Sequence, residues 1–112
     1  MKVTRGDIVL VRYPFTDLTS AKTRPAVFVS GAVYHAEQPD LLLAALTSNV
    51  RAATDSLDYV LQDWSASGLR FATAFEPVVA TLKPGSIVFR IGQMSERNLA
   101  EIEDRLRAAL EL

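Results

Sequence analysis

The sequence contains no cysteine and only one histidine, His35. Without cysteine the chain forms neither disulfides nor thiolate metal sites, and a lone histidine in a polar stretch, expected to face solvent, gives little support to a metal centre or a histidine-based nuclease. No apolar run approaches the roughly 18 residues of a membrane helix, and the N-terminus lacks the apolar core of a signal peptide. We therefore expect no metal, no cofactor and no membrane partner, and a cytoplasmic location.

The sequence also lacks an excess of charge of either sign, because 12 basic and 13 acidic side chains give a net charge of −1. This balance argues against a protein that binds nucleic acid over its whole surface. Residues 1–24, however, carry five basic side chains against two acidic ones, whereas residues 96–112 carry three arginines against five acids. Taken alone, this asymmetry is typical of an ordinary solvated surface.

The chain length fits one domain, expected to span residues 1–112, and short apolar runs separated by turn signals predict a small antiparallel barrel. Residues 32–40 are expected to form a connection. The predicted strands are 7–13, 26–29, 41–46, 57–61, 69–75, 78–82 and 87–91, with Gly92 leaving the last of them.

The C-terminal segment predicts a helix. Ser95 is a suitable N-cap, and Met94 can pack on Leu99 as a hydrophobic staple. An apolar stripe then recurs at helical spacing and must be buried against the sheet. The stripe consists of Leu99, Ile102, Leu106 and Ala109 or Leu110, and the charged side chains expected to face outward are Glu101, Glu103, Asp104, Arg105 and Arg107.

A polar loop of about ten residues joins the first two predicted strands and ends at Arg24-Pro25. Long loops on a rigid sheet are common places for function. Because proline biases the preceding residue toward an extended backbone, Arg24 is expected to hold its guanidinium at the start of the second strand. Asp17, in the same loop, is more typical of a turn former than of a catalytic base.

Hydroxyl side chains emerge where the strand at 41–46 reaches the surface, at Thr47-Ser48-Asn49. These residues are common turn formers, and they can equally donate hydrogen bonds to a phosphate. An arginine fork together with such donors can stabilise negative charge on a phosphate that is attacked by the neighbouring 2′-hydroxyl of RNA. That chemistry needs no metal.

The order and spacing of several short motifs resemble the PemK/MazF family of bacterial toxin ribonucleases. The matching stretches are Gly-Asp-Ile-Val-Leu-Val, Pro-Phe-Thr-Asp, Arg-Pro-Ala-Val-Phe-Val-Ser, Leu-Thr-Ser-Asn at 46–49, Ser67-Gly68-Leu69, Thr81-Leu82 and Ile91-Gly92-Gln93-Met94-Ser95. The resemblance covers nearly the whole chain. It implies an SH3-like barrel of the CcdB/PemK type with a C-terminal helix, assembled as a homodimer and paired with a cognate antitoxin.

The resemblance also implies a metal-independent, sequence-selective endoribonuclease that cleaves single-stranded RNA to a 2′,3′-cyclic phosphate and a 5′-hydroxyl. The residues assigned to catalysis in the family fall on Arg24 and Thr47. Candidates for RNA contact are Arg12, Thr19, Ser20, Lys22, Ser48, Asn49 and Arg70.

Two departures from the family pattern leave the general base open. Thr19 stands where some members place an acid five positions before the arginine, and Phe75 stands where many have an arginine. Asp17 and Glu76 are the available candidates for acid/base chemistry. The alternative function is a non-catalytic toxin or binding module on the same barrel, such as a gyrase poison of the CcdB type or an adaptor.

Overall fold

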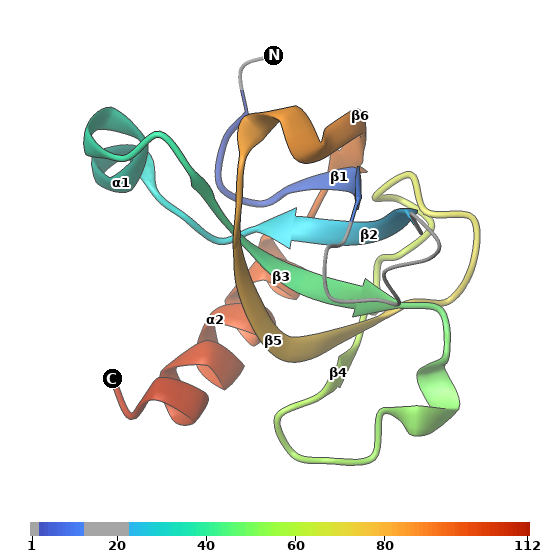
Figure 1. Cartoon of the computed structure of the whole chain (residues 1–112). Coiled ribbons are helices and arrows are strands. Elements are labelled where there is room, and N and C mark those ends of the chain that lie inside the picture. The colour runs from blue at the N-terminus through green and yellow to red at the C-terminus, as the bar shows by residue number, and fades with distance from the viewer. Residues whose placement is uncertain (1–2, 13–22) are drawn as a thin grey trace, which may run out of the picture.

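Six antiparallel strands form one curved sheet with a helix packed on one side (Figure 1). The computed structural model describes residues 3–12 and 23–112. Across the sheet the strand order is β4-β5-β3-β2-β1-β6, and among the described residues no ladder joins the edge strands β4 and β6. The elements are β1 (Asp7–Arg12), β2 (Thr23–Phe28), α1 (Ala32–Glu37), β3 (Leu41–Thr47), η1 (Val50–Ala52), β4 (Tyr59–Val60), β5 (Ala74–Leu82), η2 (Pro84–Ser86), β6 (Ile87–Gln93) and α2 (Glu96–Leu110), where η marks a 3₁₀ turn. The predicted mainly β fold with a C-terminal helix is confirmed, and its barrel is open.

Apolar side chains are buried on both faces of the sheet. Successive side chains of a strand point to opposite faces, so Ile8 of β1 enters one apolar cluster and Val9 enters the other. Leu43 and Ala44 of β3 divide in the same way. This two-sided burial explains why the strands read as continuous apolar runs rather than as an alternation.

Helix α2 covers one of these faces. Ser95 caps it by accepting a hydrogen bond from the Asn98 amide at 3.1 Å, as predicted. Ile102 is fully buried in the cluster that also contains Met94 and is flanked by Leu106. The apolar stripe ends there, because Leu110 is 61% exposed and Ala109 is also exposed.

A buried asparagine, which the sequence does not single out, ties α2 to the segment after β4. The Asn98 side chain is fully buried, and its Oδ1 accepts hydrogen bonds from the Tyr59 hydroxyl at 2.9 Å and from the Gln62 amide at 3.0 Å. Burial raises the pKa of the Tyr59 hydroxyl, which keeps that donor protonated. Arg105 lies over the Tyr59 ring, with 4.7 Å from the guanidinium carbon to the ring centre, so it packs on the sheet instead of pointing outward as predicted.

Several predicted boundaries were wrong, among them the strands predicted at 26–29 and 57–61, which the structure gives as Thr23–Phe28 and Tyr59–Val60. Residues 32–40 include the short helix α1, and its His35 is half-buried and hydrogen-bonded to Ser30 Oγ at 2.6 Å rather than solvent-facing. Residues 69–73 form no strand. Gly92 lies inside β6, which continues to Gln93.

Strand β5 begins at Ala74, four residues before the predicted strand at 78–82, and it contains Pro77. The pairing shifts between Ala44 and Leu46 of β3, so that a single residue of β3 faces residues 76–78 of β5. Because proline lacks an amide hydrogen, it is tolerated at such an irregularity.

None of the helices in the described part of the chain has the length and apolar character needed to cross a membrane.

Candidate active site

A pocket of about 540 Å³ opens where β2 begins and β3 ends. It brings together four residues singled out from the sequence: Arg24, Thr47, Ser48 and Arg70. The remaining lining residues are Thr23, Pro25, Leu46, Leu69, Phe71 and Thr73. Two cations and several hydroxyls around one hollow can bind an anion through charge-assisted and neutral hydrogen bonds.

Arg24 of β2 and Thr47 of β3 lie at the ends of neighbouring strands and line the same pocket. The β2–β3 ladder ends at the pair Ala26–Ala45, two residues away from each of them. Arg24 is exposed and Thr47 is half-buried, so both side chains can approach one group in the pocket.

The Thr47 hydroxyl is already used as a hydrogen-bond acceptor. Its Oγ1 accepts from the Asn49 amide at 3.1 Å, which is the turn-forming role considered from the sequence. A hydroxyl has one proton to donate in addition to its acceptor capacity, so the same group can donate into the pocket. Ser48 is exposed beside it, whereas Asn49 is exposed outside the pocket lining and precedes η1.

Residues 69–73 form the wall facing the strand ends. The segment does not extend as a strand, since Gly68 has φ of +90° and the Thr73 hydroxyl donates back to the Phe71 carbonyl at 2.8 Å. Leu69 packs toward the core, while Arg70 and Phe71 remain exposed. The sequence singled out Arg70 but not Phe71, because the alternating pattern of residues 69–75 predicted a strand and not an exposed loop.

Two glycines hold this wall against β6. A side chain at Gly92 would place its Cβ 2.0 Å from the Ser67 carbonyl oxygen, and one at Gly68 would place it 2.8 Å from the Ile91 carbonyl oxygen. Backbone therefore lies directly on backbone at these positions. The close contact fixes where Arg70 and Phe71 emerge.

Asp63, which precedes this wall in the chain, is bound to the start of α2. Its carboxylate accepts hydrogen bonds from Ser95 Oγ at 2.6 Å and from Arg97 Nε at 3.1 Å, and it forms an ion pair with Arg97. The Arg97 guanidinium, with help from the Ser95 hydroxyl, lowers the pKa of Asp63. The same pair raises the pKa of Arg97.

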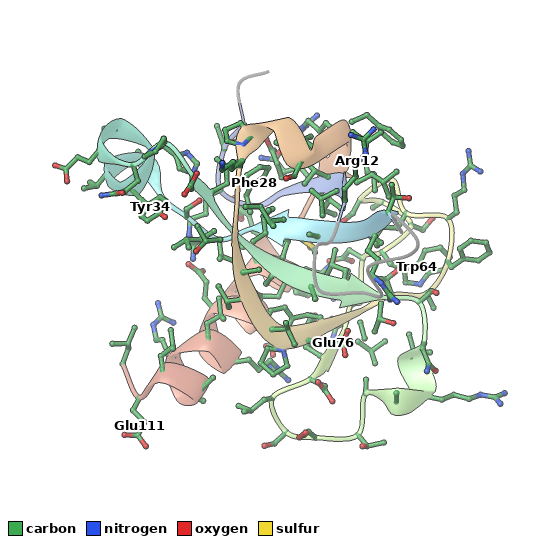
Figure 2. The ribbon with its side chains drawn as sticks, in the orientation of Figure 1. Arg12, Phe28, Tyr34, Trp64, Glu76 and Glu111 are labelled. Carbon is green, nitrogen blue, oxygen red and sulfur yellow. The ribbon has the colours of Figure 1, made fainter. Side chains whose placement is uncertain are left out.

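The other candidates lie outside the pocket lining. Arg12 is exposed at the end of β1, where it pairs across the sheet with Thr23. Glu76 is half-buried in β5. Figure 2 shows Arg12 and Trp64 near one end of the sheet and Tyr34 at the other. Asp17, Thr19, Ser20 and Lys22 lie outside the described residues.

The pocket cations differ from most arginines of the chain. Within residues 3–12 and 23–112, neither Arg24 nor Arg70 forms an ion pair with a carboxylate. In that same part of the chain, no three histidine, aspartate or glutamate side chains are grouped closely enough to hold a metal ion. The chemistry that the pocket supports is stabilisation of negative charge by a guanidinium and hydroxyl donors.

A family model described as the PemK-like, MazF-like toxin of type II toxin-antitoxin systems matches residues 4–110. Among solved structures, an endoribonuclease in complex with its cognate antitoxin from a mycobacterial species aligns with a TM-score of 0.80 at 17% identity, covering 99% of this chain and 97% of that one. MazF from Deinococcus radiodurans gives 0.77 at 19% identity over 100% and 99% of the two chains. Mycobacterium tuberculosis toxin MazF-mt6 gives 0.75 at 15% identity over 95% and 97%. No curated protein matches.

Proposed function

We propose, because this chain belongs to the PemK-like, MazF-like toxins of type II toxin-antitoxin systems, that it is an endoribonuclease that cleaves single-stranded RNA without a metal ion. The observation that carries the proposal is the pocket in which Arg24 and Thr47 meet at the ends of adjacent strands. We treat residues 1–112 as one toxin domain.

In the proposed reaction the RNA supplies its own nucleophile. The 2′-hydroxyl gives its proton to a base and attacks the adjacent phosphorus, the bond from phosphorus to the 5′-oxygen breaks, and that oxygen takes up a proton. The products are a 2′,3′-cyclic phosphate and a 5′-hydroxyl. The protein has to orient the phosphate, move two protons and stabilise the extra negative charge.

Arg24 is suited to the last of these tasks. Its guanidinium is permanently charged, and its planar donors match two phosphate oxygens at once. Thr47 and Ser48 donate hydroxyl hydrogen bonds to the same oxygens from the neighbouring strand end. Arg70, on the opposite wall, contacts a flanking phosphate. The general base is open between Asp17 and Glu76.

The partners in the proposal are an antitoxin and a second copy of the chain. Relatives of known structure include an endoribonuclease with its cognate antitoxin and a MazE-MazF assembly from Deinococcus radiodurans. A pocket lined by arginines favours an acidic antitoxin segment that competes with RNA. Half-exposed Val79 and the exposed Leu110 border a hollow of about 310 Å³ beside α2, an apolar surface available for a two-fold interface.

The decisive test is incubation of purified protein with single-stranded RNA in excess EDTA. We expect cleavage to persist and the products to carry a 2′,3′-cyclic phosphate and a 5′-hydroxyl, identified by mass spectrometry. Loss of cleavage on chelation that magnesium restores would refute the metal-free mechanism. RNA that binds without being cut would favour the non-catalytic module instead.

A further inference from the structure

A second hollow, of about 470 Å³, adjoins the candidate active site. The two share one wall, formed by Pro25, Leu69, Arg70 and Phe71. Beyond that wall the second hollow is lined by Leu10, Gly68, Phe89, Arg90 and Ile91. A ligand that leaves the first pocket past Arg70 therefore enters the second one.

The two hollows differ in chemistry. The first is lined by several hydroxyls, whereas the second is lined by apolar side chains and two arginines and, among the residues that the structure describes, by no hydroxyl or carboxylate. A phosphate needs hydrogen-bond donors and positive charge, while a nucleobase offers a broad apolar face to stack. The pair of hollows matches those two parts of a nucleotide chain.

Two phenyl rings are presented to solvent in the second hollow. Phe71 is 69% exposed on the loop wall, and Phe89 is 50% exposed on β6. Single exposed apolar residues are ordinary on protein surfaces. Here, however, two aromatic rings from separate segments line the same hollow, which is the arrangement used to stack bases of single-stranded nucleic acid.

The charge in this hollow favours an anion. Arg70 is exposed at the shared wall. Arg90 is held by an ion pair between its Nη2 and Oδ1 of the buried Asp7 at 3.2 Å, yet 46% of its side chain stays exposed. The pair fixes the guanidinium in position and leaves other N–H groups for a ligand. An acidic antitoxin would share the charge but needs no flat aromatic faces.

We propose that the second hollow is a base-binding subsite, in which a base next to the cleaved phosphate packs against both Phe71 and Phe89 while Arg70 contacts the connecting backbone. The inference rests on the proposed ribonuclease function and adds a specificity element to it. At Gly68 and Gly92 the loop that carries Phe71 lies directly against β6, which carries Phe89, so these two backbone segments are in contact without RNA. Such preorganisation limits the entropic cost of binding.

The test measures binding separately from cleavage. The probe is a fluorescent single-stranded RNA with 2′-O-methyl on every ribose, which blocks attack by the 2′-oxygen, and the readout is anisotropy. Phe71→Ala and Phe89→Ala should each weaken binding about 5- to 100-fold, the range seen when a stacked base loses its aromatic partner. Phe89→Tyr should restore most of the affinity and Phe89→Leu should not, because only tyrosine keeps a π-face.

The matched control is Tyr34→Ala, which removes an aromatic side chain from α1 at the far end of the sheet (Figure 2). It should leave RNA affinity unchanged. A second readout is photocrosslinking of the same RNA carrying 5-iodouridine, with cross-links expected in the peptides that contain Phe71 and Phe89. Thermal unfolding of each variant checks that the fold persists.

Three results would overturn the subsite. Unchanged RNA affinity in both alanine variants, with wild type still cleaving RNA, would remove it and leave the proposed function intact. Loss of affinity for the antitoxin alone would make the hollow a peptide site. If wild-type protein neither bound the probe nor cut unmodified RNA, the proposed function itself would fail and the subsite with it.

Discussion

The arginines of α2 and those of the pocket carry the same charge in opposite surroundings. On the helix, each pairs with a carboxylate: Arg97 with Asp63, Arg105 with Glu101 and Arg107 with Asp104. At the pocket, no carboxylate of residues 3–12 and 23–112 pairs with Arg24 or Arg70. The helix arginines are therefore neutralised within the protein, whereas the pocket arginines have no carboxylate partner in the described part of the chain. A chain of net charge −1 can thus keep a local site for an anion.

The contrast also concerns what holds each group in place. The helix arginines are positioned by their acidic partners, while Arg70 depends on the backbone contact between its loop and β6. Charge alone therefore does not identify a functional arginine. Its neighbours help to do so, because a pocket cation that no carboxylate of the described residues pairs can still interact with an anionic ligand.

Removing the pocket charge should have the largest effect. In Arg24→Ala the rate of RNA cleavage should fall about 10²- to 10³-fold, by analogy with the loss of one oxyanion donor. Arg24→Lys should remain impaired, because it keeps the charge but loses the planar fork. Thr47→Val should cost less. Cleavage of a fixed RNA is measured alongside thermal unfolding, which should change little because Arg24 is exposed.

The control for this experiment is Arg51→Ala in η1. Arg51 is exposed and lies outside the pocket lining, so its loss should leave cleavage close to wild type. Near-wild-type cleavage by a folded Arg24→Ala protein would erase the distinction between the two groups of arginines. The binding-module alternative would then be favoured.

The second prediction concerns a substitution that should displace the loop wall at residues 69–73 without changing any charge. Gly92→Ala would put a Cβ 2.0 Å from the Ser67 carbonyl oxygen, so the backbone must shift. We expect unfolding to become easier by about 1–3 kcal/mol, as for other overpacked sites, and cleavage to fall with it. Denaturant unfolding and the cleavage assay check this. Gly85→Ala is the matched control, because no atom lies within 4 Å of its added Cβ, and normal stability in both variants would show that the contact does not fix the wall.

Much of the fold could be predicted because its signals are local. The apolar run of β3 and the cap at Ser95 specify a strand and a helix start whatever surrounds them. That Arg24 and Thr47 line one pocket was within reach for the same reason, since each residue lies at a strand end. Their roles in catalysis stay predictions.

The missed features depend on contacts between distant segments. Residues 69–73 alternate like a strand, yet the packing of Gly68 and Gly92 makes them a loop wall. Asn98 gave no signal because a polar residue in a helix is usually exposed, and only its bonds to Tyr59 and Gln62 explain its burial. Helix α1 is too short to display an apolar stripe.

The third prediction distinguishes the pocket cation Arg70 from another exposed arginine. Arg70→Ala should weaken binding of the 2′-O-methyl RNA and make it less dependent on salt, with the slope of log affinity against log salt smaller by about 0.7, the value for one phosphate contact on a single strand. Arg51→Ala, in η1 outside both hollows, should change neither quantity. Equal effects of the two substitutions on anisotropy titrations would mean that general surface charge, rather than the pocket, binds RNA.

The smallest expected effect is the pH dependence of stability that comes from the ion pair between Asp63 and Arg97. Arg97 and Ser95 lower the pKa of Asp63 in the folded protein below its ordinary value of about 3.9. Between the two values the unfolded chain binds more protons than the folded one, so stability rises with pH. The contribution of Asp63 should be fully present above that ordinary pKa and be lost as pH falls toward the lowered one.

Substituting Asp63→Asn should therefore reduce the melting temperature slightly at pH 7 and have progressively less effect as the pH is lowered through the acid range. The effect is small because Arg97 remains 60% exposed and solvent screens the pair. Melting curves of wild type and variant at matched ionic strength provide the measurement. Asp104→Asn, which disrupts an exposed pair within α2, is the control and should lower the melting temperature less at pH 7, because Asp63 also accepts a hydrogen bond from Ser95. A constant difference between wild type and Asp63→Asn at every pH would mean that the carboxylate's charge does not fasten the loop to the helix.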